Sequence, residues 1–204
     1  MCSSDLHNSR VNCLAFSSDG TFLASSSGGE PVVIWNTVDQ SKDRSLEIPG
    51  KSVTCLVFPA DGNHLISGSS DGIVRFTNTE TDKEAFPDVE TGFAVASISS
   101  SPDGRTFVVC PPDVKLEELK PGYPFEYAIY NMGDLTKRST RKIAYGVPSI
   151  AAFHPNGKLI AVSGNSSMIH VQSVQESDDK RQIDSIGEIP ITVEVVPDGS
   201  VLVS

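Results

Sequence analysis

The sequence predicts an all-β fold that repeats one small antiparallel sheet along the chain, and three observations support this prediction. Short apolar runs flank each Asp-Gly or Asn-Gly pair, which is typical of tight hairpins because Gly tolerates a positive φ. The pairs recur every 42 residues, apart from one interval of 53, and each period has room for four short strands. The turns are Asp19-Gly20, Asp61-Gly62, Asp103-Gly104, Asn156-Gly157 and Asp198-Gly199. A period of about 40–45 residues with four strands indicates a β-propeller, whose sheets are called blades.

Five copies of the unit follow one another, and the second copy is the clearest. Its strands are expected at Val53–Phe58, His64–Gly68 and Ile73–Asn78. The other copies place their first two strands at Val11–Phe16 and Thr21–Ala24, Ala94–Ser99 and Thr106–Cys110, Ile150–Phe153 and Lys158–Val162, and Thr192–Val196 and Val201–Val203. The blades are expected at about residues 11–48, 53–87, 94–145 and 149–186, with a partial fifth at about 189–204.

The repeats resemble those of the WD-repeat family. The resemblance is carried by Val11–Gly20, Phe22–Ser27 and Val32–Asn36 in the first copy, by Val53–Asn78 and Ala94–Gly104, and more loosely by Ser149–Gln172. It implies four-stranded blades, whose outer strands would be Ser45–Ile48, Lys83–Phe86, Arg141–Tyr145 and Gln182–Ile186. The family usually closes seven blades, so four blades plus a partial fifth imply an incomplete ring, either part of a longer propeller or a truncated product. We expect the isolated chain to self-associate, because its end blades lack neighbours.

The family can join a His, a Ser, an Asp and a Trp of one blade in a hydrogen-bonded tetrad. The first copy offers His7, Ser27 and Trp35, with Gly29 at the place of the Asp. The second copy offers Ser69 and Asp71, but it has Lys51 near the place of the His and Phe76 at the place of the Trp. Because no copy holds all four residues, the blades are expected to depend on packing more than on this polar network.

Composition argues against several classes of partner. A net charge of −10 disfavours nucleic acid, since phosphate binding needs clustered Lys and Arg. No apolar run approaches the ~18 residues of a membrane span. Residues Met1–Arg10 are polar and lack the apolar core of a secretory signal, so an intracellular location, cytoplasmic or nuclear, is expected.

The cysteines indicate neither disulfides nor a metal site. Cys13 and Cys55 are 42 residues apart, which puts them at equivalent places on the inner strands of adjacent blades. They are expected to be buried, free thiols. Cys2 and Cys110 have no Cys-x-x-Cys or Cys-His neighbour, and no cofactor is expected.

Two segments are candidates for partner binding. The longer interval inserts residues 111–124, where prolines bracket a short helical segment that Asp113 can cap. The insertion is either a binding loop or a neutral surface loop, and its candidate residues are Asp113, Lys115, Glu117 and Tyr123. The second segment packs four cations into six residues of an acidic chain: Lys137, Arg138, Arg141 and Lys142. It is predicted to be an exposed hairpin that either protects a sheet edge or docks an acidic partner.

The sequence favours binding over catalysis. The histidines His7, His64, His154 and His170 show no His-x-His or metalloprotease spacing, and no phosphate loop or nucleophile elbow is present. We therefore predict an interaction scaffold that presents peptide- or protein-binding surfaces and has no catalytic activity of its own. The alternative is a propeller hydrolase whose catalytic groups lie in blades missing from this chain. Further plain repeats beyond Ser204 would favour the scaffold, and inner-strand His and acidic clusters would favour the enzyme.

Overall fold

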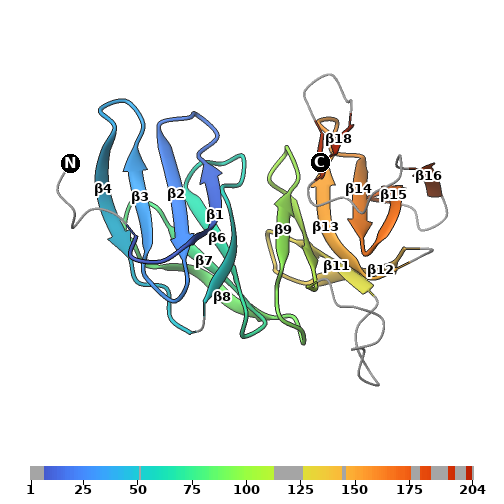
Figure 1. Cartoon of the computed structure of the whole chain (residues 1–204), viewed down its shortest axis with the longest axis horizontal. Helices are drawn as coiled ribbons and strands as arrows, with labels where there is room; N and C mark the ends of the chain where they lie inside the picture. Colours follow the sequence, from blue (N-terminus) through green and yellow to red (C-terminus); the bar gives the residue numbers. More distant parts are fainter. Residues whose placement is uncertain are drawn as a thin grey trace. The chain divides into compact units, whose positions relative to one another are not determined.

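A computed structural model describes residues 7–50, 52–112, 126–143, 146–175, 180–184, 193–195 and 201–203. Every regular element in these ranges is a β-strand (Figure 1). The chain divides into two compact units, Met1–Val95 and Ala96–Ser204. The predicted all-β class is confirmed.

The first unit consists of two four-stranded antiparallel sheets, drawn in blue and green in Figure 1. In each sheet the strands pair in the order in which the chain makes them, as expected for propeller blades. The first sheet contains β1 (Val11–Phe16), β2 (Phe22–Ser27), β3 (Val32–Asn36) and β4 (Ser41–Leu46). The second contains β5 (Val53–Val57), β6 (His64–Ser69), β7 (Ile73–Asn78) and β8 (Glu84–Glu90).

The second unit repeats this design with two more four-stranded sheets and one hairpin. The third sheet contains β9 (Ser97–Ser100), β10 (Thr106–Cys110), β11 (Glu126–Asn131) and β12 (Lys137–Lys142). The fourth contains β13 (Pro148–Phe153), β14 (Leu159–Gly164), β15 (Ser166–Ser173) and β16 (Lys180–Asp184). The hairpin pairs β17 (Val193–Val195) with β18 (Val201–Val203), where the partial fifth blade was expected.

The predicted turns join the first two strands of all four sheets with one geometry. The glycine has a positive φ of 73°, 69°, 67° and 68° at Gly20, Gly62, Gly104 and Gly157, respectively. In each turn its N–H donates to the carbonyl three residues earlier, at 2.8–3.1 Å. An L side chain is strained at such a φ, which explains why glycine recurs at this position. The fifth turn, Asp198-Gly199, lies outside the described residues.

Neighbouring sheets of the first unit share one hydrophobic core. Ala24, Val32, Ile34 and Leu46 of the first sheet pack with Val53, Leu56, Phe58 and Leu65, which come from the segment that forms the second sheet. On β1, Cys13 and Ala15 face this core and the alternate residues face away from it. Contact with the second sheet therefore buries one face of β1.

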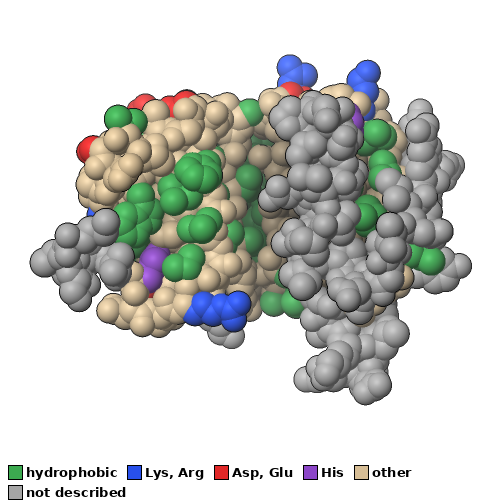
Figure 2. Space-filling model, turned by 45° about the horizontal axis from the view of Figure 1, so that its top comes forward, with side chains coloured by type: hydrophobic (Ala, Val, Ile, Leu, Met, Phe, Trp, Pro, Cys, Tyr) green, Lys and Arg blue, Asp and Glu red, His purple; other side chains and the backbone are tan. Residues whose placement is uncertain are grey.

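The opposite face of β1 is exposed. Val11, Leu14 and Phe16 are 42%, 60% and 64% exposed. Their equivalents 42 residues later, Val53, Leu56 and Phe58, are 5%, 5% and 8% exposed. Figure 2 shows hydrophobic side chains gathered on the surface of the first unit. The same residue types are thus core in one repeat and surface in the preceding one.

The cysteine prediction is confirmed in part. Among the described residues, Cys13 and Cys55 form no disulfide, and they occupy matching places, each directly after a bulge in its inner strand. Cys55 is buried, but Cys13 is only half-buried. Burial raises the pKa of the Cys13 thiol.

The outer strands differ from the expected ranges. β4 begins at Ser41 rather than Ser45, and β8 continues to Glu90. The segment Lys137–Lys142, predicted as a hairpin, is the outer strand β12 itself. The outer strands β4 and β12 begin directly after short polar turns and are exposed along much of their length. Their sequences therefore lack the apolar alternation that identifies a half-buried strand.

Candidate functional site

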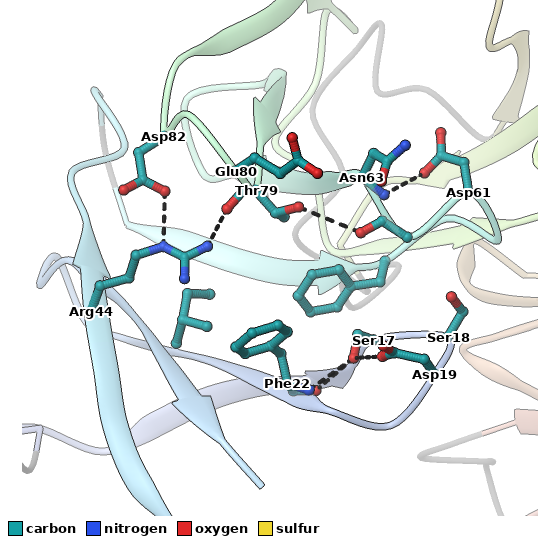
Figure 3. A pocket seen from close by; sticks show the side chains of 13 residues that line it. Ser17, Ser18, Asp19, Phe22, Arg44, Asp61, Asn63, Thr79, Glu80 and Asp82 are labelled. Atoms are coloured by element: carbon teal, nitrogen blue, oxygen red, sulfur yellow. Dashed lines mark hydrogen bonds and ion pairs between the residues drawn. The ribbon is translucent and has the colours of Figure 1, made fainter. Parts of the chain in front are cut away.

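A groove of about 560 Å³ lies between the first two sheets (Figure 3). One wall comes from the β1–β2 turn, with Ser17, Ser18 and Asp19. The other wall comes from the turns β5–β6 and β7–β8, with Asp61, Gly62, Asn63, Thr79, Glu80 and Asp82. Phe22, Ile34 and Phe58 add apolar surface, and Arg44 of β4 stands at one end of the groove.

Local hydrogen bonds hold the β1–β2 wall in place. Asp19 accepts from the Ser17 hydroxyl at 2.6 Å and from the N–H of Thr21 at 3.0 Å. The Ser17 hydroxyl also accepts from the N–H of Phe22 at 2.9 Å. Donation by Ser17 and then by Thr21 lowers the pKa of Asp19 to about 2, so this carboxylate is ionised at neutral pH.

The opposite wall adds two more carboxylates beside Asp82. Asp61 accepts from the N–H of Asn63 at 3.1 Å and pairs with His64 Nδ1 at 2.8 Å. Asp61 is therefore committed to its own turn, as Asp19 is. Glu80 is exposed, and among the described residues its carboxylate has no hydrogen-bond partner.

Arg44 links the first sheet to the β7–β8 turn. Its Nε donates to Asp82 Oδ1 at 2.9 Å, and its other nitrogens reach Asp43 and the carbonyl of Thr79. Its guanidinium carbon lies 5.8 Å from the centre of the Phe22 ring. The groove thus holds one guanidinium by an ion pair, a carbonyl and an aromatic face together.

A polar network lies at the other end of the first sheet, and it corrects the predicted tetrad. His7 Nε2 lies 2.7 Å from Ser25 Oγ, and Trp35 Nε1 donates to the same oxygen at 2.8 Å. His7 Nδ1 lies 3.2 Å from Glu30 Oε2. The serine is therefore Ser25, and Glu30 supplies the carboxylate that Gly29 lacks. Ser27, the predicted serine, is fully buried and its hydroxyl has no partner among the described residues.

The second sheet has a different polar arrangement. Asp71 pairs with Arg75 at 3.0 Å, and Ser69 donates to the carbonyl of Ser52. Burial opposes ionisation of Asp71, but hydrogen bonds from Arg75 and other donors prevail and lower its pKa to about 2. Strand pairing also shows which residue stands at the place of the Trp in the second sheet. In the first sheet Leu23 pairs with Trp35. The equivalent Leu65 pairs with Thr77, so Thr77 rather than Phe76 occupies that place.

The four predicted cations of β12 do not form one binding patch. The Arg141 guanidinium donates to the carbonyls of Ser173 and Val174, at the end of β15. Lys142 lies 3.5 Å from Glu126, and Lys137 lies over the Tyr130 ring. Alternation along a strand sends neighbouring side chains to opposite faces, which divides the cluster. Arg138 is exposed and has no partner among the described residues.

Several predicted residues cannot be placed. The insertion candidates Asp113, Lys115, Glu117 and Tyr123 lie outside the described residues, as do Lys51 and Cys2. Asp103 and Asn156 are described, and each forms its turn as predicted. Donation by the Ser101 hydroxyl is the main cause that lowers the pKa of Asp103.

Two further features are absent from the described residues. No group of three or more His, Cys, Asp or Glu side chains lies placed to hold a metal ion. No helix in the described part of the chain is long and apolar enough to cross a membrane.

Sequence reasoning did not identify the groove. Its carboxylates come from three separate turns, and each turn looks like an ordinary solvated loop in the sequence. The 42-residue spacing of Asp19 and Asp61 could have shown that they end on the same side of adjacent sheets. The position of Arg44 between the sheets has no sequence signal, because outer strands carry no clear pattern.

Comparison with known families agrees with this architecture. The family model described as WD domain, G-beta repeat matches residues 2–36 and 42–78. A search of curated proteins finds no match. WD40 propellers are generally protein-interaction scaffolds and are typically not enzymes. The first match covers β1 to β3 and the second runs from β4 through β7, so WD40 repeats build the first two sheets, and the third and fourth sheets share their strand order.

Proposed function

We propose that this chain is a protein-interaction scaffold without catalytic activity of its own, and that the groove between its two WD40 sheets binds a protein or peptide. The observation that carries the proposal is the groove itself, which joins a partly apolar lining to a polar rim. Protein-binding surfaces commonly combine an apolar centre with polar groups at the rim.

The rigidity of the groove walls supports this role. Each wall is built from turns whose side chains accept hydrogen bonds from their own backbone, as Asp19, Asp61 and Asn78 do. Loops held in this way lose little conformational entropy when a partner binds. Binding surfaces are often loops that a rigid scaffold positions.

We also propose that the protein works inside the cell. Cys13, Cys55 and Cys110 form no disulfide in the described part of the chain. Free thiols are typical of reducing compartments. Fractionation of cells that express the tagged chain would test this location, and recovery of the chain only from the medium would contradict it.

Affinity capture tests the binding role of the groove. The full chain is immobilised and exposed to cell extract, and bound proteins are quantified by mass spectrometry. Ser18→Trp fills the groove from an exposed position on its wall, and Ser45→Trp places the same side chain on the exposed face of β4, away from the groove. We expect proteins that the wild type and Ser45→Trp both capture and Ser18→Trp does not. Equal capture by all three chains would contradict a binding role for the groove.

A further inference from the structure

The groove carries a strong imbalance of charge. Its described lining contains Asp19, Asp61, Glu80 and Asp82 but only one cation, Arg44. That cation is already shared between Asp82 and Asp43. The remaining carboxylates are exposed, and no other cationic side chain lines the groove in the described part of the chain.

Arg44 shows how this groove holds a cation. Its guanidinium lies over Phe22, forms an ion pair with Asp82 and donates to the Thr79 carbonyl. The arrangement combines a cation–π contact with charge-assisted hydrogen bonds, which is the usual way in which proteins recognise arginine. The Arg44 side chain occupies one end of the groove (Figure 3).

The rest of the groove offers the same chemistry without an occupant from its own lining. Asp19 and Ser18 lie on one wall, and Asp61, Asn63 and Glu80 lie on the other (Figure 3). Phe22 is half-buried and supplies apolar surface at the Arg44 end, whereas Phe58 is only 8% exposed. A ligand that fits must therefore bring positive charge for the walls and an apolar side chain for the aromatic surface.

We propose that the groove binds a basic peptide segment of a partner protein, in which arginine or lysine stands next to an apolar side chain. This inference rests on the proposed function of the groove as a protein-binding surface. Charge complementarity selects the occupant, since four carboxylates and one guanidinium line the groove and would attract a basic segment and repel an acidic one. Attraction between opposite charges also speeds the encounter and depends on salt.

Peptide binding to the full chain tests the inference. The probe is a fluorescein-labelled eight-residue peptide that alternates leucine with arginine, and its counterparts carry glutamine or glutamate in place of arginine. Fluorescence anisotropy is measured at about 50 mM and about 500 mM salt, because salt screens exposed charges. We expect the arginine peptide to bind about tenfold more tightly than the glutamine peptide, the glutamate peptide not to bind, and high salt to weaken binding.

Three variants show whether the groove is the site. Glu80→Lys reverses a charge in the groove at a side chain that has no hydrogen bond to lose. Glu47→Lys makes the same change in net charge at an exposed residue that does not line the groove. We expect Glu80→Lys to weaken the arginine peptide about tenfold and Glu80→Gln to have an intermediate effect, with Glu47→Lys near wild type. Thermal melts of all three variants should match wild type.

Three results would overturn the inference. Equal binding of the arginine and glutamine peptides would remove charge as the basis of selection. Equal weakening by Glu80→Lys and Glu47→Lys would show general attraction to an acidic chain. No binding of the arginine peptide would also overturn it. If Ser18→Trp still abolished protein capture in that case, the interaction function would stand and only the basic occupant would be wrong.

Discussion

Ser25 is the residue on which the polar network of the first sheet depends. Its single hydroxyl oxygen lies within hydrogen-bond distance of both His7 and Trp35. Ser27 is two residues away on the same strand and is also buried, but its hydroxyl has no partner among the described residues. The two serines look equivalent in the sequence and differ only in what the fold places beside them.

Substituting each serine separates these two environments. Ser25→Ala leaves His7 and Trp35 without their shared partner and should lower the free energy of unfolding by about 1–3 kcal/mol. Ser27→Ala removes a buried hydroxyl that has nothing to bond to, and it should be neutral or slightly stabilising. Urea unfolding of the three chains measures both effects. A larger loss for Ser27→Ala would show that the network is assigned to the wrong serine.

The turn aspartates predict how stability depends on pH. Hydroxyl donation holds the pKa of Asp19 at about 2 and lowers that of Asp103, whereas an unfolded Asp titrates near ~3.9. Because the folded pKa is the lower one, the contribution is complete above the unfolded pKa and is lost as the pH falls from about 4 towards 2. The double variant Asp19→Asn with Asp103→Asn should be less stable at pH 7 and lose less stability on acidification. Urea midpoints at neutral pH and at about pH 3 measure this. Parallel losses in both chains would contradict it.

At the scale of the strand, β1 and β5 have the same sequence pattern, but their equivalent side chains contribute differently to stability. Their residues are equivalent at a spacing of 42, yet β5 is covered on both faces and β1 on only one. Phe58 lies in the core between the first two sheets, and Phe16 is 64% exposed. Burial between sheets, rather than the identity of the residue, determines its contribution.

A matched pair of truncations tests this difference. Phe58→Ala should cost about 3–5 kcal/mol, because it removes buried apolar surface and leaves a cavity. Phe16→Ala should change the free energy of unfolding by less than about 1 kcal/mol, since little buried surface is lost. Chemical unfolding gives both values. Similar losses at the two positions would show that the exposed face of β1 is covered in solution.

β12 and the fourth sheet are joined by Arg141. Its donation to two carbonyls at the end of β15 connects residues that are more than 30 positions apart. Arg141→Ala should lower the free energy of unfolding by about 1.5–3 kcal/mol, because the bonds are charge-assisted. Arg138→Ala, on the same strand but exposed, should be close to wild type. Thermal melts compare the two variants, and equal effects would contradict the structural role of Arg141.

The sequence predicted inner strands well and outer strands poorly, for a physical reason. Inner strands alternate apolar residues and end in glycine turns whose positive φ restricts the residue choice, so β5–β7 lie close to their predicted ranges. The outer strands β4 and β12 are mostly polar and their hydrogen bonds leave no pattern in the sequence. Residue roles that depend on a neighbour, such as those of Glu30 and Arg44, need the fold to bring distant segments together.

For the molecule as a whole, the repeat creates the candidate site. Two sheets of the same design lie side by side in the first unit, and their equivalent turns place carboxylates on both sides of one groove. The site therefore belongs to the junction of two repeats and to neither alone. Sequence analysis predicted both repeats and the scaffold class, but the groove needs three-dimensional packing to appear.

Backbone chemical-shift mapping tests the central claim most directly. The isotopically labelled chain of 204 residues is titrated with a protein recovered by affinity capture. If the groove is the binding surface, the largest shifts will fall on Ser17–Phe22, Asp61–Asn63 and Thr79–Asp82, and they will disappear in the Ser18→Trp variant. Shifts confined to other blades, or unchanged by Ser18→Trp, would contradict the account.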